Sequence, residues 1–225
     1  MMGSEARVDV DEFELAARAA EFETAPAGKV IAWAEERFGS KISLACSFQD
    51  CVIVDLAVRV DPSIEVLFLD TGFHFDETLQ FVEQVKSLYD LNLRVLRPGP
   101  AAEAWPCGTA RCCELRKVAP LALALESKDA WITGLKRCDA PTRAEVPIVS
   151  WDESRGLVKV NPMATWTDDD IYNYIEDHGL PVHPLIARGY LSIGCAPTTL
   201  PVAPGADPRS GRWAGTGKTE CGLHA

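Results

Sequence analysis

A cysteine near the end of this 225-residue chain has the clearest potential for covalent chemistry. Cys221 has Lys218 three residues before it and His224 three residues after it. Nearby cations favour the thiolate, which is the nucleophilic form of cysteine. The sequence therefore predicts a catalytic tail, residues 201–225, that carries this thiol back to a site built by one α/β domain, residues 1–200. The alternative is an idle cysteine on a frayed chain end.

Three further cysteines are candidate ligands of an iron-sulfur cluster. Cys112 and Cys113 are adjacent at the start of a predicted helix, and Cys195 follows Gly194. Because adjacent helical side chains point about 100° apart, two neighbouring thiolates suit two irons of one cluster better than a single zinc ion. The alternative for the adjacent pair is two small apolar helix residues.

The other cysteines are assigned packing roles or none. Cys46 and Cys51 are expected in the core, and Cys138 is given no chemistry. The first residues are polar and acidic, without the apolar core of a signal peptide, and no apolar run reaches the roughly 18 residues of a membrane span. A cytoplasmic protein is therefore expected. Since a reducing compartment keeps thiols free, its eight cysteines should not form a disulfide framework.

The charge balance is strongly acidic, with 22 Lys and Arg residues against 33 Asp and Glu residues and a formal net charge of -11. This excess makes capture of a nucleic acid or an anionic membrane through charge unfavourable. Three cations nevertheless stand close together, Lys136, Arg137 and Arg143. Because arginine matches phosphate and sulfate oxygens in pairs, they indicate a loop that closes on an anionic ligand. A solvated loop with local ion pairs is the alternative.

Apolar strands alternate with helices through the body of the chain. Strands are predicted at residues 42–48, 64–69, 91–96 and 130–135, with helices at 50–60, 76–88 and 111–125 between them. Further helices are predicted at 10–23, 26–38 and 167–178, and short strands at 148–151 and 158–160. The alternation predicts an α/β fold with a parallel-rich central sheet flanked by helices. Ligands of such sheets bind at the carboxyl ends of the strands.

Polar clusters follow two of these strands. Ser47 to Asp50 stands at a strand-to-helix turn, where backbone N–H groups and a hydroxyl can seat an anion, or where the serine is an ordinary helix cap. Asp70 to Gly72 ends the next strand, and its glycine allows close approach of a ligand or simply a tight turn. The aspartates at 168–170 are interpreted as helix-capping residues rather than as metal ligands.

Taken together, these stretches resemble the assimilatory adenylyl-sulfate reductases of the APS/PAPS reductase family. The resemblance covers roughly Ile42 to His224, in the family's order. It rests on these motifs: Ser47-Phe48-Gln49-Asp50, Leu69-Asp70-Thr71-Gly72, Cys112-Cys113 with Lys117, Thr133-Gly134 with the loop to Thr142-Arg143, Ile193-Gly194-Cys195, Arg209 to Trp213, and Glu220-Cys221-Gly222-Leu223-His224.

The resemblance implies an adenine nucleotide alpha-hydrolase-like (PP-loop-like) fold and a thiol-dependent reduction of adenosine 5'-phosphosulfate (APS) to sulfite and AMP in cysteine biosynthesis. It implies an S-sulfocysteine on Cys221 and thioredoxin or a similar thiol donor as partner, and it is compatible with a homo-oligomer. The alternatives are a cluster-free phosphoadenylyl-sulfate (PAPS) reductase and a non-catalytic iron-sulfur or thiol redox module. The last leaves the arginines without a role.

The resemblance also implies residue roles. The implied catalytic residues are Cys221, His224 and Lys117. The implied substrate-binding residues are Ser47, Phe48, Gln49, Leu69, Asp70, Thr71, Gly72, Gly134, Arg137, Arg143, Arg209 and Arg212. Among these, Leu69 and Gly134 would contact adenine through the backbone, and Ser47 would lie near the phosphosulfate.

The implied cofactor is a 4Fe-4S cluster, and here the chain departs from the family. The family pairs the adjacent cysteines with a Cys-x-x-Cys, but this chain has Cys195 followed by Thr198. A hydroxyl is a harder and weaker iron ligand than a thiolate. Three outcomes stay open: a labile cluster with oxygen at one iron, recruitment of Cys107 as the fourth ligand beside Cys112 and Cys113, or no cluster.

Overall fold

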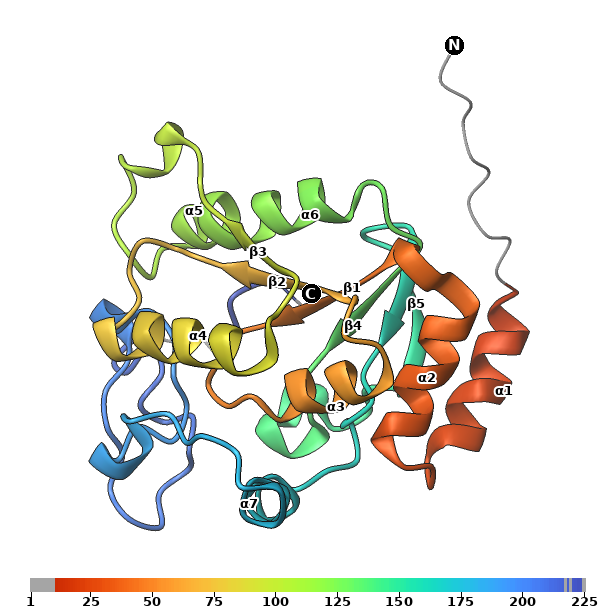
Figure 1. The fold of residues 1–225 in the computed structure, drawn as a ribbon. Helices are drawn as coiled ribbons and strands as arrows, with labels where there is room; N and C mark the ends of the chain where they lie inside the picture. The colour runs from red at the N-terminus through yellow and green to blue at the C-terminus, as the bar shows by residue number, and fades with distance from the viewer. Residues whose placement is uncertain (1–10, 217, 219, 224–225) are drawn as a thin grey trace.

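The central element is a six-stranded sheet of β1 (Ile42–Cys46), β2 (Glu65–Leu69), β3 (Leu93–Leu96), β4 (Ala130–Thr133), β5 (Val149–Asp152) and β6 (Leu157–Val160). The computed structural model describes residues 11–216, 218 and 220–223, and it orders the strands β3-β2-β1-β4-β6-β5 (Figure 1). Every neighbouring pair is parallel except β5 with β6. The predicted α/β fold with a parallel-rich sheet is confirmed.

The inner strands are apolar on both faces, as a parallel sheet covered by helices requires. Leu44 of β1 pairs in register with Val66 of β2 and with Ile132 of β4. Each of these three residues is at most 1% exposed. The carboxyl ends of β1, β2 and β4 therefore lie side by side on a rigid base.

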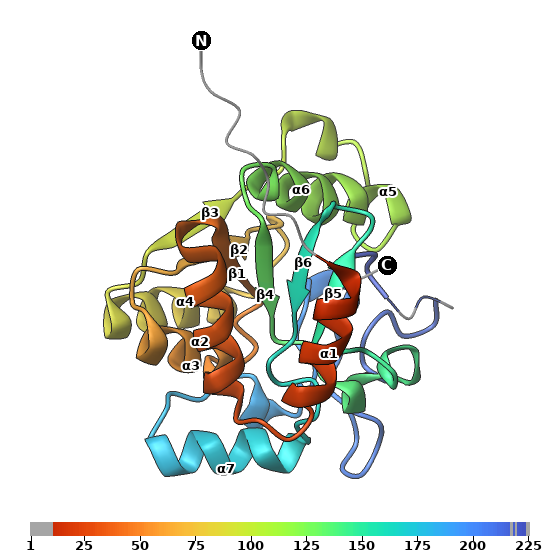
Figure 2. The same cartoon turned by 90° about the vertical axis from the view of Figure 1, so that its right-hand side faces the viewer.

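Helices cover both faces of the sheet. They are α1 (Glu12–Phe22), α2 (Ala27–Phe38), α3 (Val52–Val60), α4 (Asp76–Tyr89), α5 (Ala110–Cys113), α6 (Ala119–Leu125) and α7 (Asp168–His178). Figure 1 shows α3 and α4 on one face and α5 and α6 on the other, and Figure 2 shows α1 beside β5. Short 3-10 turns lie at Gly39–Lys41, Pro100–Ala102, Arg137–Asp139, Pro141–Arg143, Ile186–Arg188 and Ala196–Thr198.

The helix predicted over residues 111–125 is interrupted by a π-helical turn, Glu114–Val118. Pro120 follows this turn, and it has no N–H to bond the carbonyl four residues earlier. The turn brings Arg116 into the protein, where its Nη1 donates to the carbonyl of Thr71 at 2.7 Å. The adjacent cysteines and the residues after them are thereby attached to the end of β2.

Helix α7 begins with a reciprocal cap. The Thr167 hydroxyl accepts from the backbone N–H of Asp170, whose carboxylate accepts from the backbone N–H of Thr167. The predicted capping role of this acidic turn is confirmed. No helix among the described residues is long and apolar enough to cross a membrane.

The tail folds back beside the segment that carries Cys195. Arg212 forms an isolated antiparallel bridge with Thr199, and the backbone N–H of Trp213 donates to the carbonyl of Thr198 at 2.9 Å. Trp213 is only 5% exposed. The tail is therefore packed against the body of the protein, while its separate status as residues 201–225 stays a prediction.

Candidate active site

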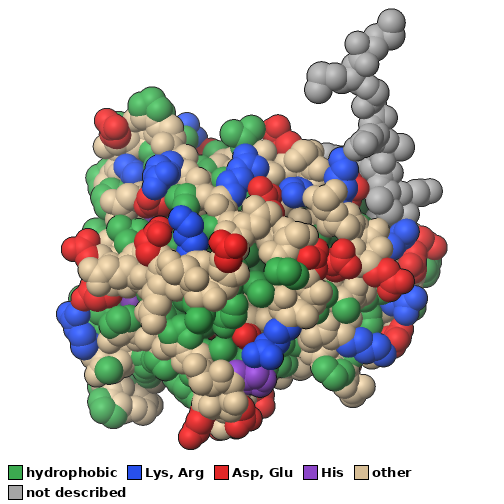
Figure 3. Space-filling view, viewed as in Figure 1, with side chains coloured by type: hydrophobic (Ala, Val, Ile, Leu, Met, Phe, Trp, Pro, Cys, Tyr) green, Lys and Arg blue, Asp and Glu red, His purple; other side chains and the backbone are tan. Residues whose placement is uncertain are grey.

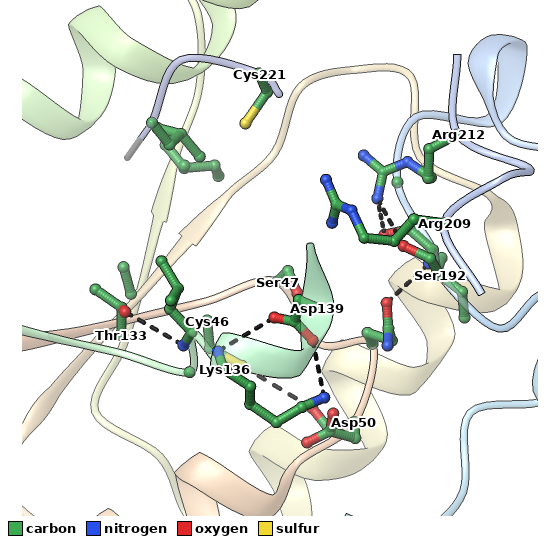
Figure 4. A pocket seen from close by; sticks show the side chains of 18 of the residues that line it. Cys46, Ser47, Asp50, Thr133, Lys136, Asp139, Ser192, Arg209, Arg212 and Cys221 are labelled. Carbon is green, nitrogen blue, oxygen red and sulfur yellow. Dashed lines mark hydrogen bonds and ion pairs between the residues drawn. The ribbon is translucent and has the colours of Figure 1, made fainter. Parts of the chain in front are cut away.

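A cavity of about 290 Å³ opens at the carboxyl ends of β1, β2 and β4 (Figure 4). Most of the residues predicted for catalysis and substrate binding line it: Ser47, Gln49, Leu69, Thr71, Lys117, Gly134, Arg143, Arg209, Arg212 and Cys221. His224, also predicted to be catalytic, lies outside the described residues. The strand ends and the tail together thus build one site, as the order of the motifs predicts.

Three predicted residues near the strand ends, Phe48, Asp70 and Gly72, are not among the described residues that line the cavity. Phe48 adopts a positive φ of 55° and is fully buried, with its ring 5.5 Å from that of Phe68. A non-glycine residue in this region is uncommon, so the backbone is held there by packing. The anchored ring leaves Ser47 and Gln49 on the cavity wall.

Asp70 and Gly72 form the turn after β2. The carboxylate of Asp70 accepts from the backbone N–H of Gly72 at 3.0 Å and pairs with Arg97 at 3.2 Å. Gly72 has a φ of 72°, a conformation that favours glycine. These contacts support the tight-turn interpretation, and the side chain that the turn contributes to the cavity is that of Thr71.

The predicted cationic loop is divided between two places. Arg137 makes a two-point ion pair with Glu23 of the N-terminal helices, at 2.8 and 2.6 Å, and it is not among the described residues that line the cavity. Lys136 does line the cavity, and it pairs with Asp139 at 2.9 Å and with Asp168 at 2.8 Å. Both aspartates are neighbours that the sequence did not indicate for the site.

The arginines of the anion side are held by a carboxylate of the tail. Glu220 accepts from Arg143 at 2.8 and 2.7 Å and from Arg209 at 3.4 Å. Burial by itself raises the pKa of Glu220, but the hydrogen bonds and charge of Arg143, with the charge of Arg209, lower the pKa below its ordinary value. The Glu220 carboxylate is therefore bound to the same arginines that, by the resemblance, would bind the anionic end of the substrate.

Arg212 is fixed to the loop that carries Cys195. Its Nη1 donates to the carbonyl of Ile193 at 3.1 Å, and its guanidinium lies 4.6 Å from the centre of the Trp213 ring. A Cβ on Gly194 would overlap this guanidinium, so glycine is required for the close approach. Figure 4 shows Arg209 and Arg212 next to each other, with Cys221 on the far side of the cavity from Asp50.

Lys117 lines the cavity together with Cys195 and Cys221. Burial lowers the pKa of Lys117, but the sulfurs of Cys195, Cys221 and Cys113 outweigh burial and raise it. A protonated lysine therefore interacts electrostatically with the nucleophile predicted by the sequence and with two of the predicted ligands.

The predicted cluster ligands are buried, and Cys195 also lines the cavity. Cys112, Cys113 and Cys195 are 2%, 5% and 6% exposed. Lys218 of the tail donates to the sulfur of Cys113 at 3.0 Å, and the hydroxyl of Thr71 lies 3.5 Å from the sulfur of Cys195. All eight cysteines fall within the described residues and are free thiols, as expected.

Cys107 joins this group. Its thiol interacts with the thiol of Cys195 and the hydroxyl of Thr198, and electrostatically with Cys112. The interaction between the two thiols raises the pKa of Cys107 and lowers that of Cys195. Soft sulfur donors are the ligands that iron-sulfur clusters take, so the donor set of these cysteines fits the cofactor that the resemblance implies.

Thr198 is occupied by its own surroundings. Its hydroxyl donates to the carbonyl of Cys195 at 3.3 Å, and its methyl lies 2.9 Å from where a Cβ on Gly108 would be. At the position of the family's second Cys-x-x-Cys cysteine, this chain thus has a hydroxyl that is already hydrogen-bonded to the backbone and lies beside the Cys107 thiol.

Cys46, Cys51 and Cys138 differ in their surroundings. Cys51 is fully buried, and burial raises the pKa of its thiol to about 12, which agrees with a packing role. Cys46 lies on the cavity wall, where its sulfur accepts from the backbone N–H of Phe48 at 3.3 Å. Cys138 is exposed.

Similarity to known proteins agrees with this geometry. A sequence model of the phosphoadenosine phosphosulfate reductase domain matches residues 41–201. The adenosine 5'-phosphosulfate reductase of Mycolicibacterium smegmatis is 48% identical over 221 residues, which cover 94% of each protein. That of Rhodococcus opacus is 47% identical over 232 residues, again 94% of each.

Two solved structures show the same fold at lower identity. The phosphoadenylyl-sulfate reductase of Candida auris superposes with a TM-score of 0.76 at 23% identity, over 87% of this chain and 100% of that one. The FMN adenylyltransferase of Candida glabrata, in complex with FAD and pyrophosphate, gives 0.62 at 14%, over 87% and 69%.

The fold and the site define an adenine nucleotide alpha-hydrolase-like protein whose thiol-bearing tail lies over a cavity lined by both cations and carboxylates. The chain belongs to the phosphoadenosine phosphosulfate reductase family.

Proposed function

We infer that this chain reduces adenosine 5'-phosphosulfate to sulfite and AMP. It is an adenylyl-sulfate reductase, an oxidoreductase of sulfate assimilation, as are the relatives that match 94% of its length. The observation that carries the chemistry is the placement of Cys221 in one cavity with Lys117, Arg143, Arg209 and Arg212. A nucleophilic thiol and a set of cations are what transfer of a sulfonate group from an anionic donor requires.

In the first step, the thiolate of Cys221 attacks the sulfur of the sulfate group. A bond forms between Sγ and that sulfur while the bond from sulfur to the phosphate oxygen breaks. AMP leaves with the electron pair of the broken bond, and Cys221 keeps the sulfonate as S-sulfocysteine. Arg143 and Arg209 hold the charge of the phosphosulfate and of the departing phosphate, which grows as the bond breaks.

In the second step, a thiolate of thioredoxin or a similar dithiol attacks Sγ of Cys221. Sulfite leaves with the bonding electron pair, and the donor's second thiol closes the resulting mixed disulfide into a disulfide of the donor. The donor thereby supplies two electrons and Cys221 is regenerated. Because Cys221 lies in the cavity, the tail has to open for this step. His224 stays a prediction as a further catalytic residue.

The nucleotide end of the substrate is assigned to the strand ends. Leu69 ends β2 and Gly134 follows β4 on the cavity wall, where their backbone groups can bind adenine. Ser47, also on the cavity wall, is assigned to the phosphosulfate. A Cβ on Gly134 would lie only 3.4 Å from Met163 Cε and 3.6 Å from Ile53 Cγ2, so the backbone is closely packed there. The cluster-free alternative is tested by comparing turnover of substrate with and without a 3'-phosphate.

We assign a 4Fe-4S cluster to Cys112, Cys113 and Cys195, with Cys107 in place of a fourth family cysteine. Cys107 is supported by its contact with both Cys195 and Thr198, and by the weakness of a hydroxyl as an iron ligand. When bound, the cluster would join the residues around α5 to the Cys195 loop and add charge beside Lys117. The reaction itself is assigned to the side chains around the cavity.

The proposed function is tested by Cys221→Ser. This variant should bind AMP as the unchanged protein does but release no sulfite, because no S-sulfocysteine can form. Cys138→Ser is the matched control, since that exposed thiol also lies on the cavity wall but has no part in the proposed chemistry. Sulfite release by Cys221→Ser at the unchanged rate contradicts the assignment. Sulfite release by the unchanged protein excludes the alternative of a non-catalytic redox module.

A further inference from the structure

The end of the tail is attached to the sheet by two contacts just beyond Cys221. The side chain of Leu223 packs against the apolar cluster between the sheet and α6, which includes Trp131 and Leu157. The carbonyl oxygen of Leu223 accepts a hydrogen bond from Nη2 of Arg155 at 2.9 Å. One attachment is apolar and the other is a charge-assisted hydrogen bond.

Arg155 is held in place by its own hairpin. It lies in the turn between β5 and β6, its side chain is 7% exposed, and its Nη1 pairs with Asp152 at 2.9 Å and with Ser154 at 3.1 Å. Its guanidinium lies 5.0 Å from the centre of the Trp131 ring. Both the donor and the apolar surface therefore belong to the body of the protein, and each faces the same tail residue.

We propose that Arg155 is a positioning residue for Cys221, which holds the tail closed through the carbonyl of Leu223. The inference rests on the proposed role of Cys221 as nucleophile. Only Gly222, with a φ of 85°, separates the thiol from the anchored residue, so a shift at the anchor moves the thiol directly. Arg155 itself is not among the described residues that line the cavity.

The attachment matches the needs of a two-step reaction. Cys221 has to stay over the cavity for the first step and leave it for the thiol donor in the second. The tail is held on both sides of Cys221, by the ion pairs of Glu220 with Arg143 and Arg209 and by the hydrogen bond from Arg155 to Leu223. The hydrogen bond to the Leu223 carbonyl, beside one leucine side chain, favours the closed position at this end and is weak enough to break. Since Arg143 contacts the tail through Glu220 instead, loss of Arg155 should displace the thiol while the cations of the cavity stay in place.

The test is Arg155→Met, which keeps an unbranched apolar side chain over Trp131 but cannot donate. Alkylation of Cys221 by iodoacetamide, without substrate and followed on the C-terminal peptide by mass spectrometry, should be about tenfold faster than in the unchanged protein. The kcat for sulfite release should fall about tenfold, with KM for APS within about twofold. Glu153→Gln is the matched control, because that carboxylate is exposed on the same turn and is not among the described partners of Arg155.

Alkylation and kcat at unchanged values in Arg155→Met overturn the proposal, as does an equal effect of Glu153→Gln, which would place the cause in the charge of the hairpin. Leu223→Ala tests the attachment from the tail side and leaves the hairpin intact. It should also speed alkylation, and unchanged protection there overturns the proposal even if Arg155→Met does not fold. Failure of the proposed function would appear separately, as sulfite release by Cys221→Ser, because protection from alkylation needs no turnover.

Discussion

The anion side of the cavity, formed by Arg143 and Arg209, differs from the cysteine group, formed by Cys107, Cys112, Cys113 and Cys195, in the partners that its side chains have. On the anion side, Arg143 is bonded to Glu220 and to Asp139, so charged groups of the chain satisfy one another. In the cysteine group, the thiols of Cys195 and Cys107 interact with each other. Thr198 occupies the position at which the resemblance implies another cysteine. Protein groups alone complete the first region, whereas the second is a set of sulfur donors suited to a metal cluster.

This difference indicates that substrate binding and cluster binding can be damaged separately. Figure 3 shows basic and acidic side chains mixed over one face of the protein. The cations assigned to the substrate are those inside the cavity. Lys117 and Arg212 line the cavity and also interact electrostatically with Cys195. A change elsewhere in one region should leave the other intact, and each prediction below tests that separation.

The largest effect is expected for Arg143→Gln. Glutamine lacks the positive charge and the paired N–H donors with which a guanidinium binds an anion. The value of kcat/KM for APS should therefore fall by about a hundredfold to a thousandfold, as it does when a hydrogen-bond donor to a developing negative charge is removed. Iron and sulfide content should not change. Steady-state kinetics and metal analysis on the same preparation measure both.

Arg137→Gln is the matched comparison from the same loop. The resemblance implies a substrate role for Arg137, but the structure pairs it with Glu23 outside the described cavity lining. We therefore expect little change in kcat/KM. A loss as large as that of Arg143→Gln would restore the assignment made from the sequence.

A smaller effect on activity, and a large one on metal, is expected for Cys107→Ser. If Cys107 is the fourth ligand, loss of iron to a chelator should speed by at least about tenfold, since even outer partners of ligands cost that much. Affinity for AMP should stay unchanged. The double variant Cys107→Ser with Thr198→Cys should recover the iron content and the visible spectrum. Equal iron content in Cys107→Ser and the unchanged protein contradicts the assignment.

The sequence predicted the sheet, its order of motifs and most of the cavity wall, because apolar periodicity and the polar ends of strands determine these locally. It did not predict that Phe48 lies outside the described cavity lining, that Arg137 binds Glu23, or that Arg155 reaches the tail. Each of these depends on which distant segment packs beside a side chain, and spacing along the chain carries no signal for that. Glu220 stood within a recognised motif, but its partners became visible only in three dimensions.

A moderate effect is expected for Glu220→Gln. The Glu220 carboxylate competes with an anionic ligand for Arg143 and Arg209, so its removal should tighten binding of AMP by about tenfold. Calorimetry measures this, with iron content as the check on the cysteine group. Glu153→Gln is the control for net charge, because that carboxylate is exposed on the β5–β6 turn. If both variants bind AMP equally more tightly, the effect comes from net charge, and competition between the Glu220 carboxylate and AMP for the arginines is contradicted.

The smallest effect is the acid dependence of tail closure. Arg143 and Arg209 lower the pKa of Glu220 when the tail is closed. The stabilisation of the closed tail by the Glu220 carboxylate is therefore fully present above the ordinary pKa that this carboxyl has in the open tail. It is lost as pH falls through the lowered pKa. Amide exchange of the C-terminal peptide, corrected for intrinsic rates, should thus be flat from pH 8 to about 5 and rise below about 4. Glu220→Gln should show no such rise, whereas a rise shared by both proteins would place the acid-sensitive group elsewhere.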